Sequence, residues 1–226
     1  MWLNLLPMNH LKEITLLLRK EFTLEFRQSY AISGILLYVL STVFIIYISF
    51  QNVSPQLWNV LFWVIMLFAS INAVVKSFVQ ESGNRQLYYY QIANPLAILL
   101  SKMLYNALLL LVLGILTFLA LSFVAGDPVE EAGKFALALF LGSIGFSITF
   151  TFVSAIAAKA DNTSTLMAVL SFPLIIPILL VLVNLSAHSI GLLKGTMITS
   201  DIMLLASVDL ILIALGLVLF PYIWRD

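Results

Sequence analysis

Few residues of this chain have the types and spacing that catalysis requires. The sequence contains no cysteine, which excludes disulfides, thiolate metal sites and a cysteine nucleophile. It has no glycine-rich phosphate loop followed by lysine, because Gly83-Asn84-Arg85 lacks the spacing of that motif. We also find no Ser/His/Asp triad and no paired carboxylates. We therefore predict a chain that is not an enzyme and that holds no metal or resident cofactor.

The two histidines, His10 and His188, are the remaining candidates for metal ligands. The topology predicted below puts them on opposite sides of a membrane, so they cannot share a metal ion. A single His188 could ligate a heme iron axially. Our first interpretation is that His188 is a solvated loop histidine near the outer end of the fifth predicted span.

Asp209 is a carboxylate inside an apolar segment. An ionisable group in hydrocarbon is costly, so such residues are usually paired or functional. Asp209 could be protonated, or it could form a hydrogen bond to an asparagine or a serine on a neighbouring helix. The candidate amides belong to Asn72, Asn106 and Asn184. Structural pairing is our first interpretation, and a role in transport is the alternative.

Two further patterns concern helix shape and packing. Pro173 and Pro177 are four residues apart, so they share one helix face and predict a kink, either a static bend or a hinge. The fourth predicted span carries small residues at one-turn spacing, which permit close contact with another helix of this chain or of a partner. These small residues are Ala138, Gly142, Ser143, Gly145 and Ser147.

The polar stretch Gln80–Lys102 is the longest interruption of the apolar sequence after residue 30. Within it, residues 85–92 have helical spacing, and Asn94-Pro95 ends this short helix and begins the next span. The consecutive tyrosines Tyr88–Tyr90 predict a short helix parallel to the membrane that docks on a cytosolic partner. Alternatively, they anchor the chain at the headgroup level. Both interpretations can hold together.

The composition requires a membrane to position these residues. The chain is 62% hydrophobic and 10% charged, which is too apolar for a domain folded in water. We predict one all-α transmembrane domain over residues 1–226, with residues 80–97 as a cytosolic segment. The expected elements are an amphipathic interfacial helix over 9–29 and transmembrane helices over 30–50, 57–79, 98–125, 134–158, 163–184 and 202–223.

Lysine and arginine set the orientation. With a cytosolic N-terminus, two cations, Lys134 and Lys194, lie outside. The other nine lie inside: Lys12, Arg19, Lys20, Arg27, Lys76, Arg85, Lys102, Lys159 and Arg225. This bias follows the positive-inside rule and predicts that both termini are cytosolic.

Three stretches together resemble the CcmB family, heme exporter protein B of cytochrome c maturation. The first holds an acidic residue, a leucine, a proline and a lysine in the family's order: Glu81, Leu87, Pro95 and Lys102. The second, Pro173–Pro177, is similar to the family's Pro-Leu-x-Ile-Pro. The third is the ending Phe220–Trp224. The broader family does not require Tyr88–Tyr90, so the tyrosines are a departure from its pattern.

The resemblance implies an ABC-2 or type V exporter-like membrane subunit in the bacterial inner membrane. ATP would be hydrolysed by a separate, CcmA-like cytosolic subunit. Further implied partners are a CcmC-like heme-handling membrane subunit, a small accessory membrane subunit and, indirectly, a periplasmic heme chaperone. Heme would be a substrate and not a bound cofactor. No nucleic acid partner is expected, because the formal net charge is zero.

The segment Glu81–Pro95 is then the expected coupling element, with residues 159–162 as a second contact. The expected ATPase contacts are Glu81, Arg85, Leu87, Tyr88, Tyr89, Tyr90 and Pro95. Two other functions are compatible with the same sequence: an ABC-2-type permease for another substrate, and a membrane scaffold that transports nothing.

Overall fold

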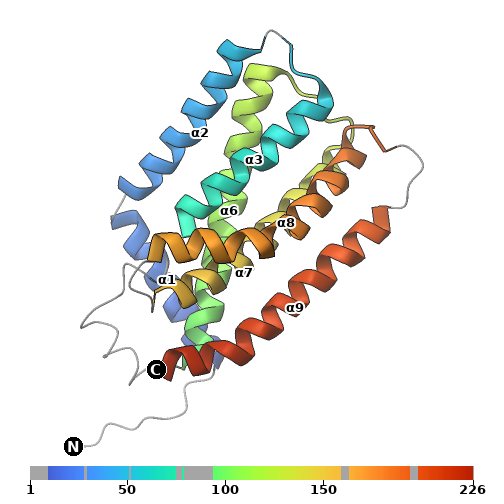
Figure 1. Ribbon diagram of the computed structural model, residues 1–226. Coiled ribbons are helices and arrows are strands. Elements are labelled where there is room, and N and C mark those ends of the chain that lie inside the picture. The colour runs from blue at the N-terminus through green and yellow to red at the C-terminus, as the bar shows by residue number, and fades with distance from the viewer. Residues whose placement is uncertain are drawn as a thin grey trace, which may run out of the picture.

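The computed structural model describes residues 10–27, 30–50, 52–74, 78, 94–158, 163–193 and 198–225. These residues form α-helices and short connections, and no strand occurs among them (Figure 1). The helices are α1 (His10–Arg27), α2 (Tyr30–Ser49), α3 (Pro55–Val74), α6 (Pro95–Ala125), α7 (Ala132–Ala157), α8 (Thr163–Ser189) and α9 (Ile198–Arg225).

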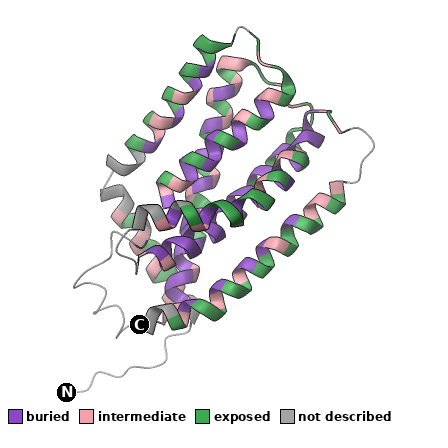
Figure 2. Ribbon diagram, viewed as in Figure 1, coloured by how far each residue is buried: buried purple, intermediate pink, exposed green. Residues whose placement is uncertain are grey.

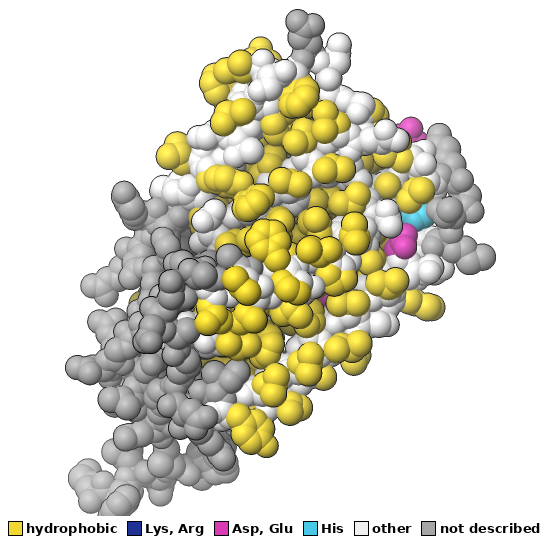
Figure 3. All heavy atoms as spheres, viewed as in Figure 1, with side chains coloured by type: hydrophobic (Ala, Val, Ile, Leu, Met, Phe, Trp, Pro, Cys, Tyr) yellow, Lys and Arg dark blue, Asp and Glu magenta, His cyan; other side chains and the backbone are white. Residues whose placement is uncertain are grey.

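Among the described residues, five helices are long and apolar enough to cross a bilayer by length and composition: α3, α6, α7, α8 and α9. Helix α2 runs beside them and is apolar over Ser33–Ser49. Apolar side chains are spread over the whole described part of the face shown in Figure 3, as expected where lipid replaces water as the solvent. The fold is therefore that of an all-α membrane protein.

The chain passes up and down through the bundle. The connections at 52–54 and 126–131 lie at one end, together with the end of α8 (Figure 1). We call this end the outer end, and the opposite end the inner end, after the topology predicted from the charges. Helix α6 has 31 residues, or about 46 Å at 1.5 Å per residue, which exceeds the hydrocarbon thickness of about 30 Å. It must therefore tilt or extend beyond the hydrocarbon core.

Helix α7 is the centre of the bundle, and it contacts α3, α6, α8 and α9. Figure 2 shows it as a mostly buried helix. Its glycines permit this packing: a Cβ at Gly142 would lie 2.7 Å from the indole of Trp63, and one at Gly145 would lie 2.8 Å from Asp209 Oδ1. The small residues predicted in this span therefore serve contacts within the chain.

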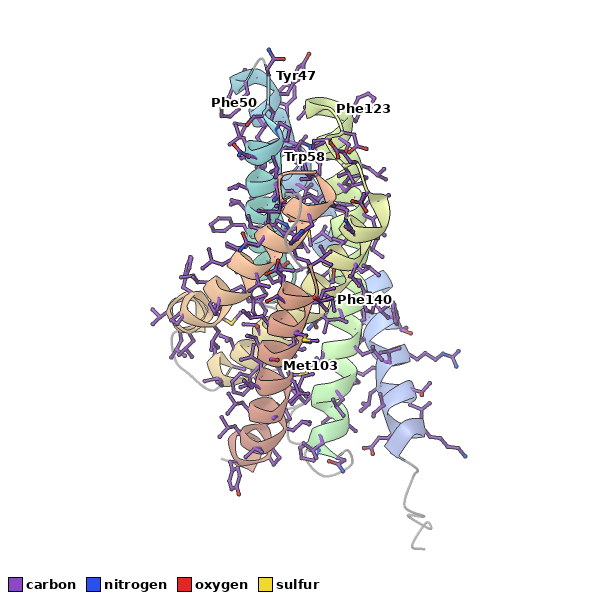
Figure 4. The ribbon with its side chains drawn as sticks, turned by 90° about the vertical axis from the view of Figure 1, so that its right-hand side faces the viewer. Tyr47, Phe50, Trp58, Met103, Phe123 and Phe140 are labelled. Atoms are coloured by element: carbon purple, nitrogen blue, oxygen red, sulfur yellow. The ribbon has the colours of Figure 1, made fainter. Side chains whose placement is uncertain are left out.

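Helices α1 and α2 both pack along α6. Figure 4 shows α1 beside the first half of α6. The exposed residues of α1 include Lys12 and Arg19, while Leu17 packs against the core. This amphipathic helix therefore has a partner within the chain, which the sequence did not indicate.

Helix α8 contains both predicted kink residues, Pro173 and Pro177, and both side chains are exposed. Figure 1 shows that α8 changes direction along its length. Prolines inside a helix are the usual cause of such a bend. Whether the bend acts as a hinge remains a prediction. Helix α8 also continues to Ser189, five residues beyond the predicted end at Asn184.

Candidate coupling site

Most of the predicted coupling residues lie outside the described part of the chain. These are Glu81, Arg85, Leu87, Tyr88, Tyr89 and Tyr90. Of the predicted set, Pro95 is described, and it occupies the first turn of α6. The residues that border the segment, Phe78 and Asn94, are also described, and their contacts define the described part of the site.

Asn94 caps the helix that follows the segment. Its side-chain Oδ1 accepts a hydrogen bond from Leu96 N at 3.0 Å, as in many helix N-caps. Pro95 suits the first turn because it needs no backbone N–H there. The backbone N–H of Asn94 donates to Glu13 Oε1 of α1 at 2.7 Å. The end of the segment is therefore attached to α1.

Phe78 forms the other border and is 3% exposed. The Lys102 ammonium lies 5.0 Å from the centroid of its ring, which is a cation–π distance. The ring of Phe220 in α9 lies 5.6 Å from the ring of Phe78. Phe78, which precedes the segment, is therefore packed between α6 and α9.

Lys102 is buried. The positive-inside rule had predicted only that it lies on the inner side of the membrane. Lys102 is 1% exposed, and its Nζ lies 3.2 Å from Glu21 Oε1 of α1. Lys20 reaches the same Glu21 oxygen at 3.4 Å. A buried lysine needs a counter-charge, and Glu21 supplies one. We call Glu13, Glu21, Phe78, Asn94 and Lys102 the inner junction.

Asp209 lies inside α9 and is 6% exposed, as the prediction of an intramembrane polar residue requires. Its Oδ1 has no hydrogen-bond partner among the described residues and lies against Gly145. Pairing with Asn72 or Asn106 was the wrong interpretation.

The amides proposed for Asp209 bond elsewhere. Asn106 donates to Thr151 Oγ1 at 2.8 Å, and Asn72 donates to its own helix at Phe68 O. Asn184 is exposed. A sequence indicates which asparagines lie at the same membrane depth as a carboxylate. It does not indicate how each helix is rotated about its axis, and this rotation decides which side chains meet.

His188 is not a solvated loop residue, so the interpretation from the sequence was wrong. It lies in the last turn of α8, is 6% exposed, and its Nε2 is 3.0 Å from Asp201 Oδ2 of α9. The error came from ending the fifth span at Asn184. The described residues contain no group of three or more His, Asp or Glu that could hold a metal ion.

A buried polar network in the outer half joins α3 to α8, and the sequence reading missed it. Trp63 Nε1 donates to Ser186 Oγ at 2.7 Å, and Asn59 Nδ2 donates to Val183 O at 2.9 Å. The Ser186 hydroxyl lies 2.6 Å from Asn59 Oδ1. The available signal was the four-residue spacing of Asn59 and Trp63, which puts them on one helix face. We call Asn59, Trp63 and Ser186 the outer network.

The described helices also border an apolar pocket of about 700 Å³ between α2 and α6. Its lining residues are Leu40, Ser41, Val43, Phe44, Tyr47, Ala120, Phe123 and Val124. None of them is charged or can ligate a metal through an imidazole or thiolate. Among these lining residues, Tyr47 has the only side chain of a type that ligates heme iron in other proteins.

The five long apolar helices of the described part define a multi-pass membrane protein. A family model for the CcmB protein matches residues 12–222. The chain therefore belongs to the CcmB family, the membrane subunits of the heme exporter ABC transporter of cytochrome c maturation. A comparison with curated proteins found no match.

Proposed function

We propose that this chain couples ATP hydrolysis in a separate cytosolic subunit to heme export, or to the release of a heme-loaded periplasmic chaperone. It would do so from the bacterial inner membrane with both termini in the cytosol. Membership of the CcmB family is the observation that carries this proposal. The chain itself would be non-catalytic, and its partner would be a CcmA-like ATPase.

The coupling element in this proposal is the segment 80–97. Its support is the position of its borders: Phe78 and Asn94 both lie in the inner junction, where α1, α6 and α9 meet. A force applied to the segment would act directly on these helices. Arg85 and the three tyrosines would be the main ATPase contacts, and Glu81, Leu87 and Pro95 would complete the contact surface.

The remaining partners follow from the family and not from contacts in this chain. They are a CcmC-like heme-handling subunit, a small accessory membrane subunit and the periplasmic chaperone. In this proposal heme enters as cargo. An ABC-2 permease for another substrate is the competing function, and it predicts normal c-type cytochromes after deletion of the gene. A scaffold predicts that no ATPase binds.

One experiment tests the coupling element. The chain is tagged, expressed with the ATPase of its complex and purified from membranes, with Arg85→Glu and with Tyr88, Tyr89 and Tyr90 each replaced by Ala. We expect both variants to insert normally and to retain much less ATPase than the wild type. Tyr47→Ala is the matched control, because Tyr47 is a 60% exposed tyrosine on α2. Unchanged ATPase retention in both variants would contradict the assignment of this segment as the coupling element.

The same strains test the substrate. Deletion of the gene should abolish covalent heme in c-type cytochromes, and the wild-type chain should restore it. Normal heme attachment in the deletion strain would instead favour the permease for another substrate.

A further inference from the structure

Two carboxylates of α1 contact α6 in the same register. Glu13 accepts from the backbone N–H of Asn94, and Glu21 pairs with Lys102, so each contact joins residues 81 positions apart. Eight residues separate the two glutamates, which is slightly more than two helical turns and places them on one face. The ring of Phe22 also lies 5.1 Å from that of Tyr105, edge to face. Helix α1 thus runs parallel to the first turns of α6.

Both contacts are made to residues that follow the segment 79–93, and one of them is linked to the residue before it. Glu13 holds Asn94, the residue directly after the segment. Glu21 holds Lys102, whose ammonium lies over the ring of Phe78, the residue directly before the segment. Helix α1 therefore contacts one border directly through Glu13, and it is linked to the other border through Lys102.

We propose that α1 is a two-point clamp that positions the coupling segment, an inference that rests on the proposed function of that segment. Glu13 and Glu21 are positioning residues in this arrangement, because they act on the segment through Asn94 and Lys102. The clamp fixes the distance between the two borders, so a movement imposed on the segment is passed to α6 and α1 together. Without it, the same movement is absorbed at the borders.

The chemistry of the contacts explains why carboxylates are required. Glu21 is the counter-charge of an ammonium that is 1% exposed, and the side chain of Glu21 is itself 13% exposed. Helix α1 also has lysines and arginines, but none of them can accept a hydrogen bond from a backbone N–H. Glutamine has the size of glutamate and lacks its charge, so Glu→Gln tests the charge with little change in packing.

The test uses the full chain expressed with its ATPase, and it compares Glu13→Gln, Glu21→Gln and the double variant with the wild type. The matched control is Glu131→Gln, which removes the same charge from the exposed pair with Lys134 at the outer end. The first readout is the rate of tryptic cleavage after Arg85 in inverted membrane vesicles, measured by mass spectrometry. The second is covalent heme in c-type cytochromes of the same cells.

We expect the double variant to reach the membrane at the wild-type level and to be cleaved faster after Arg85. We expect its cytochrome heme to fall about tenfold, within the usual range of coupling between sites. The control should match the wild type in both readouts. Restoring the pair in reverse, with Glu21→Lys and Lys102→Glu together, should give more heme than either single change, as expected for directly coupled residues.

Wild-type cleavage and wild-type heme in the double variant would overturn the clamp. If the double variant does not reach the membrane, Glu13→Gln alone decides the question, because it leaves Lys102 paired with Glu21. Wild-type behaviour of that variant would overturn the clamp as well. The cleavage assay needs no ATPase, so it still tests the clamp if the chain proves to bind none. Failure of the proposed function is therefore distinguishable from failure of this inference.

Discussion

The inner junction and the outer network tie helices together by different chemistry. The inner junction joins charged side chains of α1 and α6 across 81 residues of sequence, and Glu21 remains partly exposed. The outer network joins neutral groups of α3 and α8, and Asn59, Trp63 and Ser186 are all almost completely buried. Both sets hold the bundle, but they respond differently to the loss of one partner.

The difference indicates which end of the bundle is suited to transmit force. Removing one member of a buried ion pair leaves an uncompensated charge, whereas a neutral hydrogen bond contributes only about 1 kcal/mol net. The inner junction therefore links its helices through contacts that are costly to break. It also borders the segment that the family relationship makes the expected contact of the ATPase. The outer network has no such neighbour and reads as a fixed part of the scaffold.

The largest effect should come from breaking the inner junction on one side. Glu21→Gln removes the carboxylate beside an almost fully buried ammonium, so we expect a loss of about 3 kcal/mol in unfolding free energy. Lys102→Met should cost clearly less, because Glu21 keeps Lys20 at 3.4 Å and some exposure to water. Both are measured by denaturant unfolding in detergent micelles. Equal losses in the two variants would contradict the asymmetry of the junction.

A second, smaller effect concerns the packing of α7 against α3 and α8. Gly142→Ala places a methyl group 2.7 Å from the indole of Trp63 and 3.0 Å from Leu182, so Trp63 must shift and the outer network with it. We expect a loss of about 2 kcal/mol, as for other overpacked cores. Gly34→Ala is the control, since a Cβ at Gly34 meets nothing within 4 Å. A loss at Gly34 as large as that at Gly142 would remove the steric explanation.

Composition and helical length were sufficient to predict the class of fold. The apolar sequence and its turn residues indicated an all-α membrane protein, and the small residues of α7 indicated close helix packing. The same reasoning failed to predict side-chain partners, because these depend on how each helix is rotated about its axis. Asp209 was expected to meet an asparagine and instead lies against Gly145, because the face that each helix presents is decided by the packing of the whole bundle.

The candidate site was predictable only in part, for a related reason. The sequence indicated a polar segment between two spans, and it gave Lys102 as part of the family pattern. It did not indicate that Glu13 and Glu21 reach the borders of this segment, because contacts across 81 residues leave no local periodicity. His188 was misjudged through one helix end placed five residues too early.

The smallest effect should distinguish two buried tryptophans of α3. Trp63 Nε1 donates to Ser186, whereas Trp58 Nε1 is buried and has no hydrogen-bond partner among the described residues. Replacing either by Phe removes similar volume, but only Trp63→Phe loses a hydrogen bond. We therefore expect Trp63→Phe to lower the free energy of unfolding in detergent by about 1 kcal/mol more than Trp58→Phe does. If Trp58→Phe were the more damaging change, the hydrogen bond would not be what stabilises the outer network. Its stability would then come from aromatic packing, since Trp58 stacks on Phe62 with ring centroids 5.7 Å apart.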